Sequence, residues 1–411
     1  MIRRKVEHLL KKQLSKKEIT ILIGARQVGK TTVIKKIISE LRGKGNKVVF
    51  FNLDFESDAR YFESQELLLK KIRLELGDSP GYVFVDEIQR KEDAGRFLKG
   101  IYDLDLPYKF VVTGSGSLQL KEKISESLTG RKRLIEMHPV SFEEFVDYKT
   151  KYKYSDRLEL FYEVSSEKMD SLLSEYLAYG SYPQLITENN QQQKKEIINE
   201  IFTSYITRDI TYLLGVRSPD KFVLFIQLLA VQRGSIINYA RLASDINISV
   251  ETLKRYLWFA EHTFVIYVVT PFYTNNKKEL TKSPTIYFND LGMNNFARNE
   301  FGRINKTTGG FVFQNFVFQL LQQKYDNVTD RICYWRTKDK AEVDFVIRQV
   351  DKIFPIEVKF THLKKPTISR SYRSFIEKYQ PQQGYIINLS LDEEVNIGVT
   401  RVSIIPYWKL L

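Results

Sequence analysis

The chain has 411 residues, of which 43% are hydrophobic, and it carries a formal net charge of +13 at pH 7. This composition excludes a disordered chain and leaves room for two or three domains with separate cores. Because the sequence has neither a long apolar run nor a signal-peptide core, we expect a soluble, cytoplasmic protein without membrane contact. A single cysteine and four scattered histidines exclude an internal disulfide or a thiolate metal site and argue against a histidine-rich one.

The excess of basic residues favours a polyanionic partner such as DNA. A basic composition shared by all proteins of the organism would produce the same excess. The charge therefore suggests a partner but says nothing about the fold.

The first third of the chain alternates short apolar runs with amphipathic stretches of helical spacing. The runs are rich in β-branched and aromatic residues, which is typical of strands that are covered on both faces. This order predicts an α/β domain with a parallel sheet. The expected strands are residues 19–23, 47–52, 82–86, 109–113 and 133–137.

A phosphate-binding loop follows the first of these strands. Residues 24–32 match the pattern G-x-x-x-x-G-K-[ST] and lead into a helix, which is the context that such a loop requires. Glycines allow successive backbone N–H groups to point at phosphate oxygens, while the lysine reaches the β- and γ-phosphates and the next hydroxyl reaches Mg²⁺. The sequence therefore predicts a site for ATP and Mg²⁺. Its residues are Gly24, Ala25, Arg26, Gln27, Val28, Gly29, Lys30, Thr31 and Thr32.

Two acids end the third predicted strand. We expect Asp86 to help hold Mg²⁺ and Glu87 to activate the attacking water. The next strand ends in a small polar turn, where Ser115 or Thr113 is a candidate sensor of the γ-phosphate, although a purely structural turn fits nearly as well.

These motifs together resemble one family. The loop, Val-Asp-Glu-Ile-Gln-Arg at 85–90, Val-Thr-Gly-Ser at 112–115, Leu-Thr-Gly-Arg at 128–131 and Pro-Val-Ser-Phe-Glu-Glu-Phe at 139–145 are similar to those of prokaryotic predicted ATPases of the AAA superfamily. These ATPases carry a conserved C-terminal domain of unknown function. The resemblance implies ATP hydrolysis in a homo-oligomer such as a ring. It also suggests that Arg131, or else Arg133, reaches the γ-phosphate of a neighbouring subunit; an arginine that only forms surface salt bridges fits equally well.

The middle of the chain is predicted to be helical, with a break at residues 180–183. Three helices near 222–230, 238–245 and 249–261, followed by strands near 263–271 and 285–289, have the order of a winged helix. Its basic residues are candidates for DNA phosphate contacts, although such a unit can instead serve packing or subunit contact. The candidates are Lys254, Arg255, Lys277, Lys278 and Lys282.

The C-terminal part combines an acid on one predicted strand, Asp344, with Glu357 and Lys359 on the next. This arrangement resembles the core of metal-dependent restriction endonucleases, in which Asp344 and Glu357 would share Mg²⁺. Such nucleases usually take a further acid from a preceding helix, but here that position is Gln314, which Glu342 could replace. A nuclease-like fold with weak or no cleavage is therefore the favoured interpretation.

We thus predict four regions: an AAA-type P-loop core (1–150), a helical lid or linker (151–217), a winged-helix domain (218–304) and a restriction-endonuclease-like α/β domain (305–411). The predicted activity is ATP hydrolysis by a DNA-associated motor or remodelling oligomer. The alternatives are a nucleotide-gated switch with slow turnover and an ATP-regulated, metal-dependent nuclease.

Overall fold

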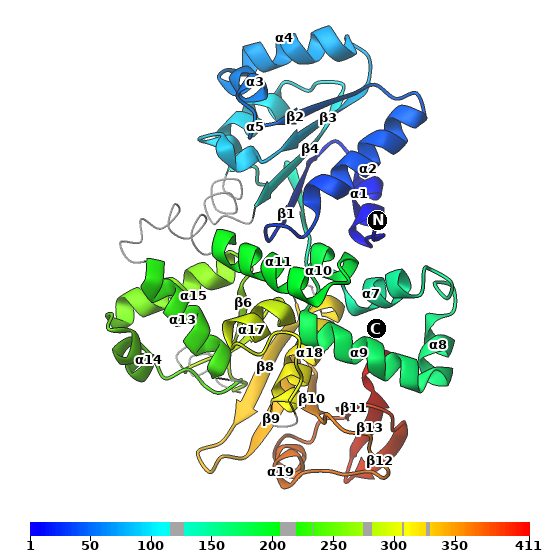
Figure 1. Ribbon diagram of the computed structural model, residues 1–411, viewed down its shortest axis with the longest axis vertical. Coiled ribbons are helices and arrows are strands. Elements are labelled where there is room, and N and C mark those ends of the chain that lie inside the picture. Colours follow the sequence, from blue (N-terminus) through cyan, green and yellow to red (C-terminus); the bar gives the residue numbers. More distant parts are fainter. Residues whose placement is uncertain (116–126, 206–218, 233, 274–281, 306–307, 326–328) are drawn as a thin grey trace.

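A computed structural model describes residues 1–115, 127–205, 219–232, 234–273, 282–305, 308–325 and 329–411 (Figure 1). Within these residues, no helix is long and apolar enough to cross a lipid bilayer.

The first domain is built on a five-stranded parallel sheet with the order β2-β3-β4-β1-β5. All five strands lie within one residue of their predicted starts, because short apolar runs between helical stretches mark them clearly in the sequence. The order itself places β4 between the loop strand β1 and the acid-bearing strand β3. The strands are β1 (Ile19–Gly24), β2 (Val48–Asn52), β3 (Gly81–Asp86), β4 (Tyr108–Ser115) and β5 (Lys132–Glu136).

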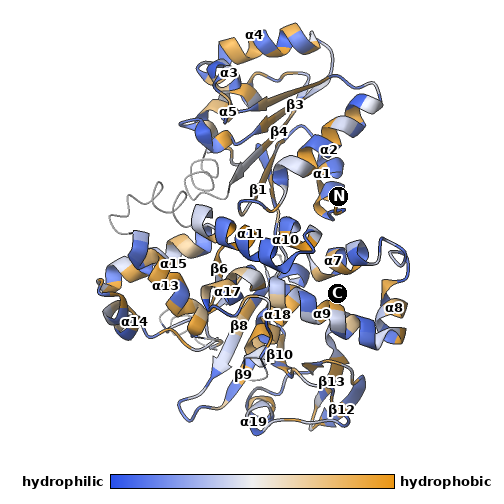
Figure 2. Cartoon of the chain, viewed as in Figure 1, coloured by the Kyte–Doolittle hydropathy of each residue, from blue (hydrophilic) through white to orange (hydrophobic). Residues whose placement is uncertain are grey.

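Helices cover both faces of this sheet, with α1 and α2 on one face and α4 and α5 on the other (Figure 1). This division follows from right-handed crossovers, since the chain moves across the sheet in opposite directions after β1 and after β2. Figure 2 shows hydrophobic and hydrophilic residues alternating along α4, as expected of a helix with one buried face. The helices are α1 (Val6–Gln13), α2 (Lys30–Gly43), α3 (Glu56–Ala59), α4 (Gln65–Leu76) and α5 (Ala94–Asp103), with one-turn helices η1 (Arg60–Phe62) and η2 (Ile88–Arg90).

Among its described residues, the predicted helical middle consists of helices joined by short turns. The predicted break lies at Gly180, which has a φ of +76°. A Cβ atom at Gly180 would lie 2.3 Å from the backbone nitrogen of Gly292, so only glycine fits this approach. The helices are α7 (Phe142–Lys149), α8 (Leu158–Val164), α9 (Ser166–Tyr179), α10 (Pro183–Thr187) and α11 (Gln191–Ser204).

Three helices and a two-stranded antiparallel ribbon follow in the predicted order. Asn238 and Ser249 cap α14 and α15, as each side chain accepts a hydrogen bond from the backbone three residues later. The ribbon is not a free wing, because the chain after β6 pairs with the C-terminal sheet through Phe272 N and Tyr334 O, 2.6 Å apart. The elements are α13 (Pro219–Val231), α14 (Tyr239–Ile246), α15 (Val250–His262), β6 (Ile266–Val269), β7 (Thr285–Phe288) and α17 (Leu291–Ala297).

The C-terminal part is a mixed six-stranded sheet with the order β12-β13-β11-β10-β9-β8. Strand β10 pairs antiparallel with β9 and parallel with β11. Its elements are α18 (Gly309–Lys324), β8 (Arg331–Arg336), β9 (Glu342–Arg348), β10 (Ile353–Val358), α19 (Arg370–Tyr379), β11 (Gln383–Asn388), β12 (Glu393–Ile397), β13 (Thr400–Pro406) and the short helix η4 (Tyr407–Leu410).

Two large hydrophobic clusters run across the predicted domain boundaries. One joins the ATPase sheet to buried residues between Tyr182 and Phe301. The other joins Ile2 and the helices from α7 to α10 to the strands and helices after Val312. The chain therefore passes from one cluster to the other more than once.

Candidate nucleotide-binding site

The phosphate-binding loop lies between the carboxyl end of β1 and the start of α2. Gly29, at the start of α2, has a φ of +99°, and Gln27 also lies in the left-handed region with a φ of +59°. The other loop glycine, Gly24, packs so closely that a Cβ atom there would lie 2.2 Å from the carbonyl oxygen of Met137. Both glycines are thus required by the backbone, one for its conformation and one for a close approach.

Lys30 is buried and turned back onto the loop. Its Nζ donates hydrogen bonds to the carbonyl oxygens of Gly24, at 3.0 Å, and Ala25, at 2.8 Å. The lysine head group therefore lies over the loop, where the phosphates of a nucleotide would be received.

A hydroxyl and a carboxylate meet beside the loop. Thr31 Oγ1 donates to Asp86 Oδ2 at 2.7 Å, which joins the start of α2 to the end of β3. On its other oxygen, the buried Asp86 accepts a hydrogen bond from the hydroxyl of Thr113 on β4. The same hydroxyl accepts a hydrogen bond from the backbone nitrogen of Glu87 at 3.2 Å. These contacts depend on the strand order, because β4 separates β1 from β3.

Glu87 adopts an uncommon backbone conformation, with a φ of +57°. Burial raises the pKa of its carboxyl group, and the positive charge of Lys30 opposes this shift in part. Gln89 donates a side-chain hydrogen bond to the Glu87 carboxylate. A carboxylate that is partly buried and held in place has the features of a general base.

The chemistry of these groups fits ATP with Mg²⁺. The Thr31 hydroxyl and the Asp86 carboxylate are oxygen ligands of the kind that Mg²⁺ prefers, and they already lie at hydrogen-bond distance. The positive-φ loop and Lys30 provide the donors for phosphate oxygens. The residues predicted for the ATP site thus come together in one place.

Ser115 and Arg131, the other two residues predicted for catalysis, lie at opposite ends of the sheet. Ser115 ends β4, and only its backbone lies among the features described, paired with Gly24. Arg131 lies at the opposite end of the sheet, because its carbonyl oxygen accepts a hydrogen bond from Ile19, the first residue of β1. Its Nε lies 2.8 Å from Asp103 Oδ1. Arg131 is therefore outside the nucleotide site of its own chain, and its ion pair with Asp103 fits a surface salt bridge as well as the predicted role in a neighbouring subunit.

Three parts of the chain match known families. Residues 16–146 match the profile of a family described as an AAA domain. The chain carries an AAA domain. Residues 170–303 and residues 309–410 match two further families, each described as a domain of unknown function. The match confirms the AAA superfamily and the C-terminal domain of unknown function, while the winged-helix and restriction-endonuclease-like assignments stay predictions.

Relatives similar in sequence over most of this chain occur in bacteria and archaea. An uncharacterized protein of Mycobacterium tuberculosis is 26% identical over 388 residues, which cover 92% of this chain and 78% of the relative. One from Methanocaldococcus jannaschii is 26% identical over 412 residues, covering 95% and 88%. Among solved structures, AMPPCP-bound DnaA from Aquifex aeolicus matches 62% of this chain and 86% of its own, with a TM-score of 0.31 and 14% identity.

The predicted C-terminal acids also come together. Asp344 Oδ1 accepts a hydrogen bond from Gln314 Nε2 at 2.9 Å, and its Oδ2 accepts one from Val358 N at 2.7 Å. Glu357 forms an ion pair with Lys359 at 2.7 Å. Burial, followed by the charge of Glu357, raises the pKa of Asp344 to about 7.

This cluster lacks a third acid. Glu342, expected as a substitute, instead lies 3.5 Å from Arg336 on the neighbouring strand. No group of three or more histidines, cysteines or acids suited to a metal ion occurs among the residues that the structure describes. Asp344 is instead contacted by the neutral side-chain amide of Gln314, which supplies no charged oxygen ligand.

Three of the five basic residues predicted to contact DNA lie among the described residues of the middle region. Lys254 and Arg255 are exposed on α15, and Lys282 is exposed just before β7. Lys277 and Lys278 lie outside the described residues.

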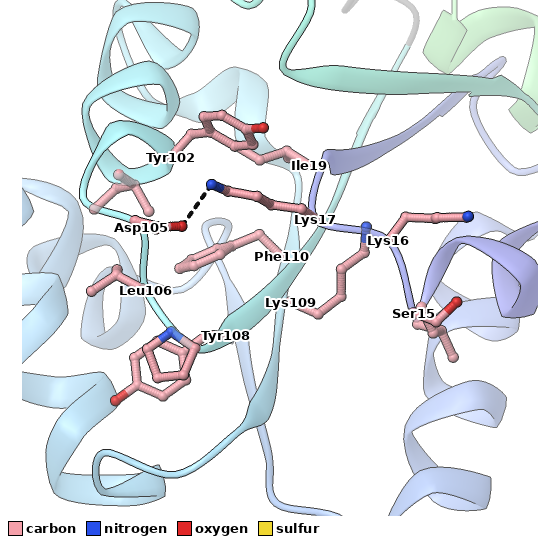
Figure 3. A pocket seen from close by; sticks show the side chains of 13 residues that line it. Ser15, Lys16, Lys17, Ile19, Tyr102, Asp105, Leu106, Tyr108, Lys109 and Phe110 are labelled. Atoms are coloured by element: carbon pink, nitrogen blue, oxygen red, sulfur yellow. Dashed lines mark ion pairs between the residues drawn. The ribbon is translucent and has the colours of Figure 1, made fainter.

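A cavity of about 340 Å³ lies at the amino ends of β1 and β4, away from the phosphate loop (Figure 3). Lys17 and Asp105 form an ion pair of 2.6 Å beside it. Lys109, also in its lining, is buried and donates a hydrogen bond to the carbonyl oxygen of Glu18, and burial lowers its pKa to about 8. None of the phosphate-loop residues lines this cavity, so it is not part of the nucleotide site.

Sequence reasoning missed two residues of the site, Gln89 and Arg4. Gln89 belongs to a family motif in the sequence, and its position two residues after Glu87 allows the hydrogen bond between the two side chains. Arg4 donates to the carbonyl oxygen of Val28 in the loop at 2.8 Å, yet it lies more than twenty residues earlier in the chain. No local pattern in the sequence marks such a contact.

Proposed function

We propose that this protein hydrolyses ATP and uses the energy as a DNA-associated motor or remodelling ATPase that works as a homo-oligomer. The observation that carries the hydrolysis proposal is the set of contacts from Thr31 to Asp86 and from Thr113 to Asp86 and Glu87, directly beside the phosphate loop.

In this proposal, each residue has a separate task. The loop amides and Lys30 bind the phosphates, and Thr31 and Asp86 hold Mg²⁺, which supplies charge neutralisation on the phosphate oxygens. Glu87 orients a water molecule and accepts its proton as the water oxygen attacks the γ-phosphorus atom. The bond from that phosphorus atom to the bridging oxygen breaks, and ADP and phosphate leave.

The oligomer is proposed from the position of Arg131. This residue is remote from its own loop but partly exposed, with its guanidinium held by Asp103. In a head-to-tail arrangement of subunits, such an arginine is able to approach the γ-phosphate bound by the next subunit and stabilise charge there.

The DNA partner is proposed from charge. The chain has a net charge of +13, and Lys254, Arg255 and Lys282 are exposed in the helical and ribbon region. Exposed lysines and arginines suit contacts to backbone phosphates, which position a protein on DNA without reading its sequence.

Steady-state ATPase rates with and without duplex, forked and single-stranded DNA test this proposal. We expect turnover that increases with DNA and no nucleotide binding by Lys30→Ala. Glu87→Gln should bind ATP but hydrolyse it about a hundredfold or more slowly than the parent. The exposed Glu92→Gln serves as a matched control. A rate unaffected by every DNA form, with no DNA retention at low salt, would exclude the motor and favour a nucleotide-gated switch.

A second function, metal-dependent DNA cleavage, is suggested by the meeting of Asp344, Glu357 and Lys359. We propose that this site is nuclease-like without efficient cleavage, because Gln314 presents an amide to Asp344. Incubation of plasmid DNA with Mg²⁺ or Mn²⁺ tests this. Cleavage by the parent that is lost in Asp344→Ala would contradict it, whereas equal activity of both proteins would point to a contaminant.

A further inference from the structure

Arg4 is a buried arginine that lies before the residues of the AAA match and reaches the outer side of the phosphate loop. Its Nη1 donates to Val28 O at 2.8 Å, while Nη2 donates to His138 O at 2.6 Å and to Pro139 O at 3.1 Å. Its Nε forms a buried ion pair of 3.0 Å with Glu144. One guanidinium therefore joins the loop to the junction between β5 and α7.

In the proposed nucleotide site, the contact with Val28 acts on a peptide unit that would bind phosphate. The carbonyl oxygen of Val28 and the N–H of Gly29 belong to the same peptide, and in a trans peptide they point in opposite directions. A cation on the oxygen polarises the peptide and makes the N–H a stronger donor. Arg4 thus acts on the side of the peptide that faces away from the Gly29 N–H.

The other contacts of Arg4 fix it in place. Glu144 Oε2 accepts hydrogen bonds from Arg4 and from Ser141 N at 2.9 Å, and Oε1 accepts one from Lys5 N at 2.6 Å. Glu144 and Ser141 also form the capping box of α7. An arginine held in this way loses little conformational entropy when a nucleotide binds, since it is already ordered.

We propose that Arg4 is a positioning residue for phosphate binding: it fixes and polarises the Val28–Gly29 peptide from behind the loop and ties that peptide to the start of α7. This inference rests on the proposed nucleotide-binding function. It assigns to the region before the AAA match a part in recognising phosphate.

The test compares ADP with adenosine, which has no phosphate. The main variant is Arg4→Met/Glu144→Gln, since removing both members of the pair avoids an unpaired buried charge and glutamine preserves the capping box. Arg3→Met is the matched control, because Arg3 is exposed and stacks on Tyr152 with its guanidinium carbon 4.3 Å from the ring centre. Melting curves first establish that each protein is folded.

We expect the Kd for Mg-ADP to rise about tenfold in the double variant, the weakening that corresponds to the loss of one charge-assisted hydrogen bond. The affinity for adenosine, measured by competition with a fluorescent ADP analogue, should stay within twofold. Arg4→Lys, which keeps the positive charge, should weaken Mg-ADP binding less than the double variant does. Arg3→Met should bind Mg-ADP as well as the parent.

An unchanged Kd for Mg-ADP in the double variant would overturn the inference. An equal weakening for ADP and adenosine would do so as well, because it would indicate general damage rather than an effect on phosphate. If the parent does not bind Mg-ADP any better than Lys30→Ala, then the proposed function itself is wrong, and the inference is wrong with it.

Discussion

The hydroxyl of Thr113 donates a hydrogen bond to the carboxylate of Asp86, across the interface between β4 and β3. Because the same hydroxyl also accepts the N–H of Glu87, one small side chain orients both acids of the nucleotide site. The sequence also suggests Thr113 as a sensor of the γ-phosphate, and its hydroxyl contacts both acids beside the phosphate loop. It is therefore expected to support catalysis by holding the acids in position.

Thr113→Val should reduce kcat for ATP hydrolysis by about ten- to a hundredfold, because it removes a hydrogen bond to a charged group without changing the side-chain shape. Thr113→Ser, which retains the hydroxyl, is the matched control and should stay close to the parent. Steady-state ATPase assays measure kcat, and ADP titrations measure the nucleotide affinity. A valine variant within twofold of the parent would show that the acids keep their positions unaided.

Gln314→Glu should create a third acid beside Asp344 and Glu357. Affinity for hard divalent ions increases with the number of charged ligands, so Mn²⁺ binding should strengthen by about tenfold or more. Calorimetric titration with Mn²⁺ measures this change. Gln323→Glu, which adds the same charge to an exposed position of α18, is the control, and equal Mn²⁺ affinity in the two variants would argue against a metal site at this place.

Lys109→Met should stabilise the protein in a pH-dependent manner. Burial lowers the pKa of Lys109 from 10.5 to about 8, so the folded protein bears the cost of a buried charge below pH 8. Between pH 8 and 10.5 the unfolded chain still binds the proton while the folded chain has released it, so the parent gains stability as the pH rises. The advantage of the methionine variant should be largest below pH 8, up to about 3 kcal/mol, and should shrink toward pH 10.5.

Urea unfolding at pH 7 and at pH 10 measures this difference. The exposed Lys99→Met on α5 is the control and should give the same small effect at both pH values. The loss of the hydrogen bond to Glu18 reduces the gain at every pH but does not change its direction. An advantage that is the same at pH 7 and pH 10 would contradict the shifted pKa.

Lys254→Glu/Arg255→Glu should weaken DNA retention at low salt and reduce the salt dependence of binding by about one unit of slope per lost phosphate contact. Fluorescence anisotropy with a labelled duplex at several salt concentrations gives both quantities. Lys70→Glu on α4 reverses the charge of an exposed lysine in the AAA domain and should leave binding nearly unchanged. Similar losses in all variants would mean that net charge alone attracts the DNA.

Local patterns in the sequence were sufficient to predict the strands and the phosphate loop. Residues 19–23, for example, form a short apolar run that is followed by the glycine-containing phosphate loop. Residues 82–86 form another run, which ends in Asp86 and is followed by Glu87, so the local sequence alone locates each strand. The strand order was not predictable in this way, because it depends on contacts between distant segments. The role of Thr113 follows from that order, and so it emerged only from the structure.

The C-terminal site was predicted in part. The alternation of strand residues correctly brought Glu357 and Lys359 to one face, where they form an ion pair. The hydrogen bond from Gln314 to Asp344 depends on how α18 packs against the sheet, which no periodicity reveals. Arg4 is the extreme case, since its partners Val28, His138 and Glu144 are spread over more than a hundred residues.

The two interleaved hydrophobic clusters limit how this chain can be divided in the laboratory. A fragment ending near residue 150 would keep the nucleotide loop but expose the side chains that the segment from Tyr182 to Phe301 covers. It would also lose Pro183, which lies beside the loop, 3.8 Å from a Cβ atom built on Gly29. Such a fragment is expected to aggregate rather than bind ATP. Co-expression of the two pieces as separate chains, which lets each cover the other, is the suitable way to dissect this molecule.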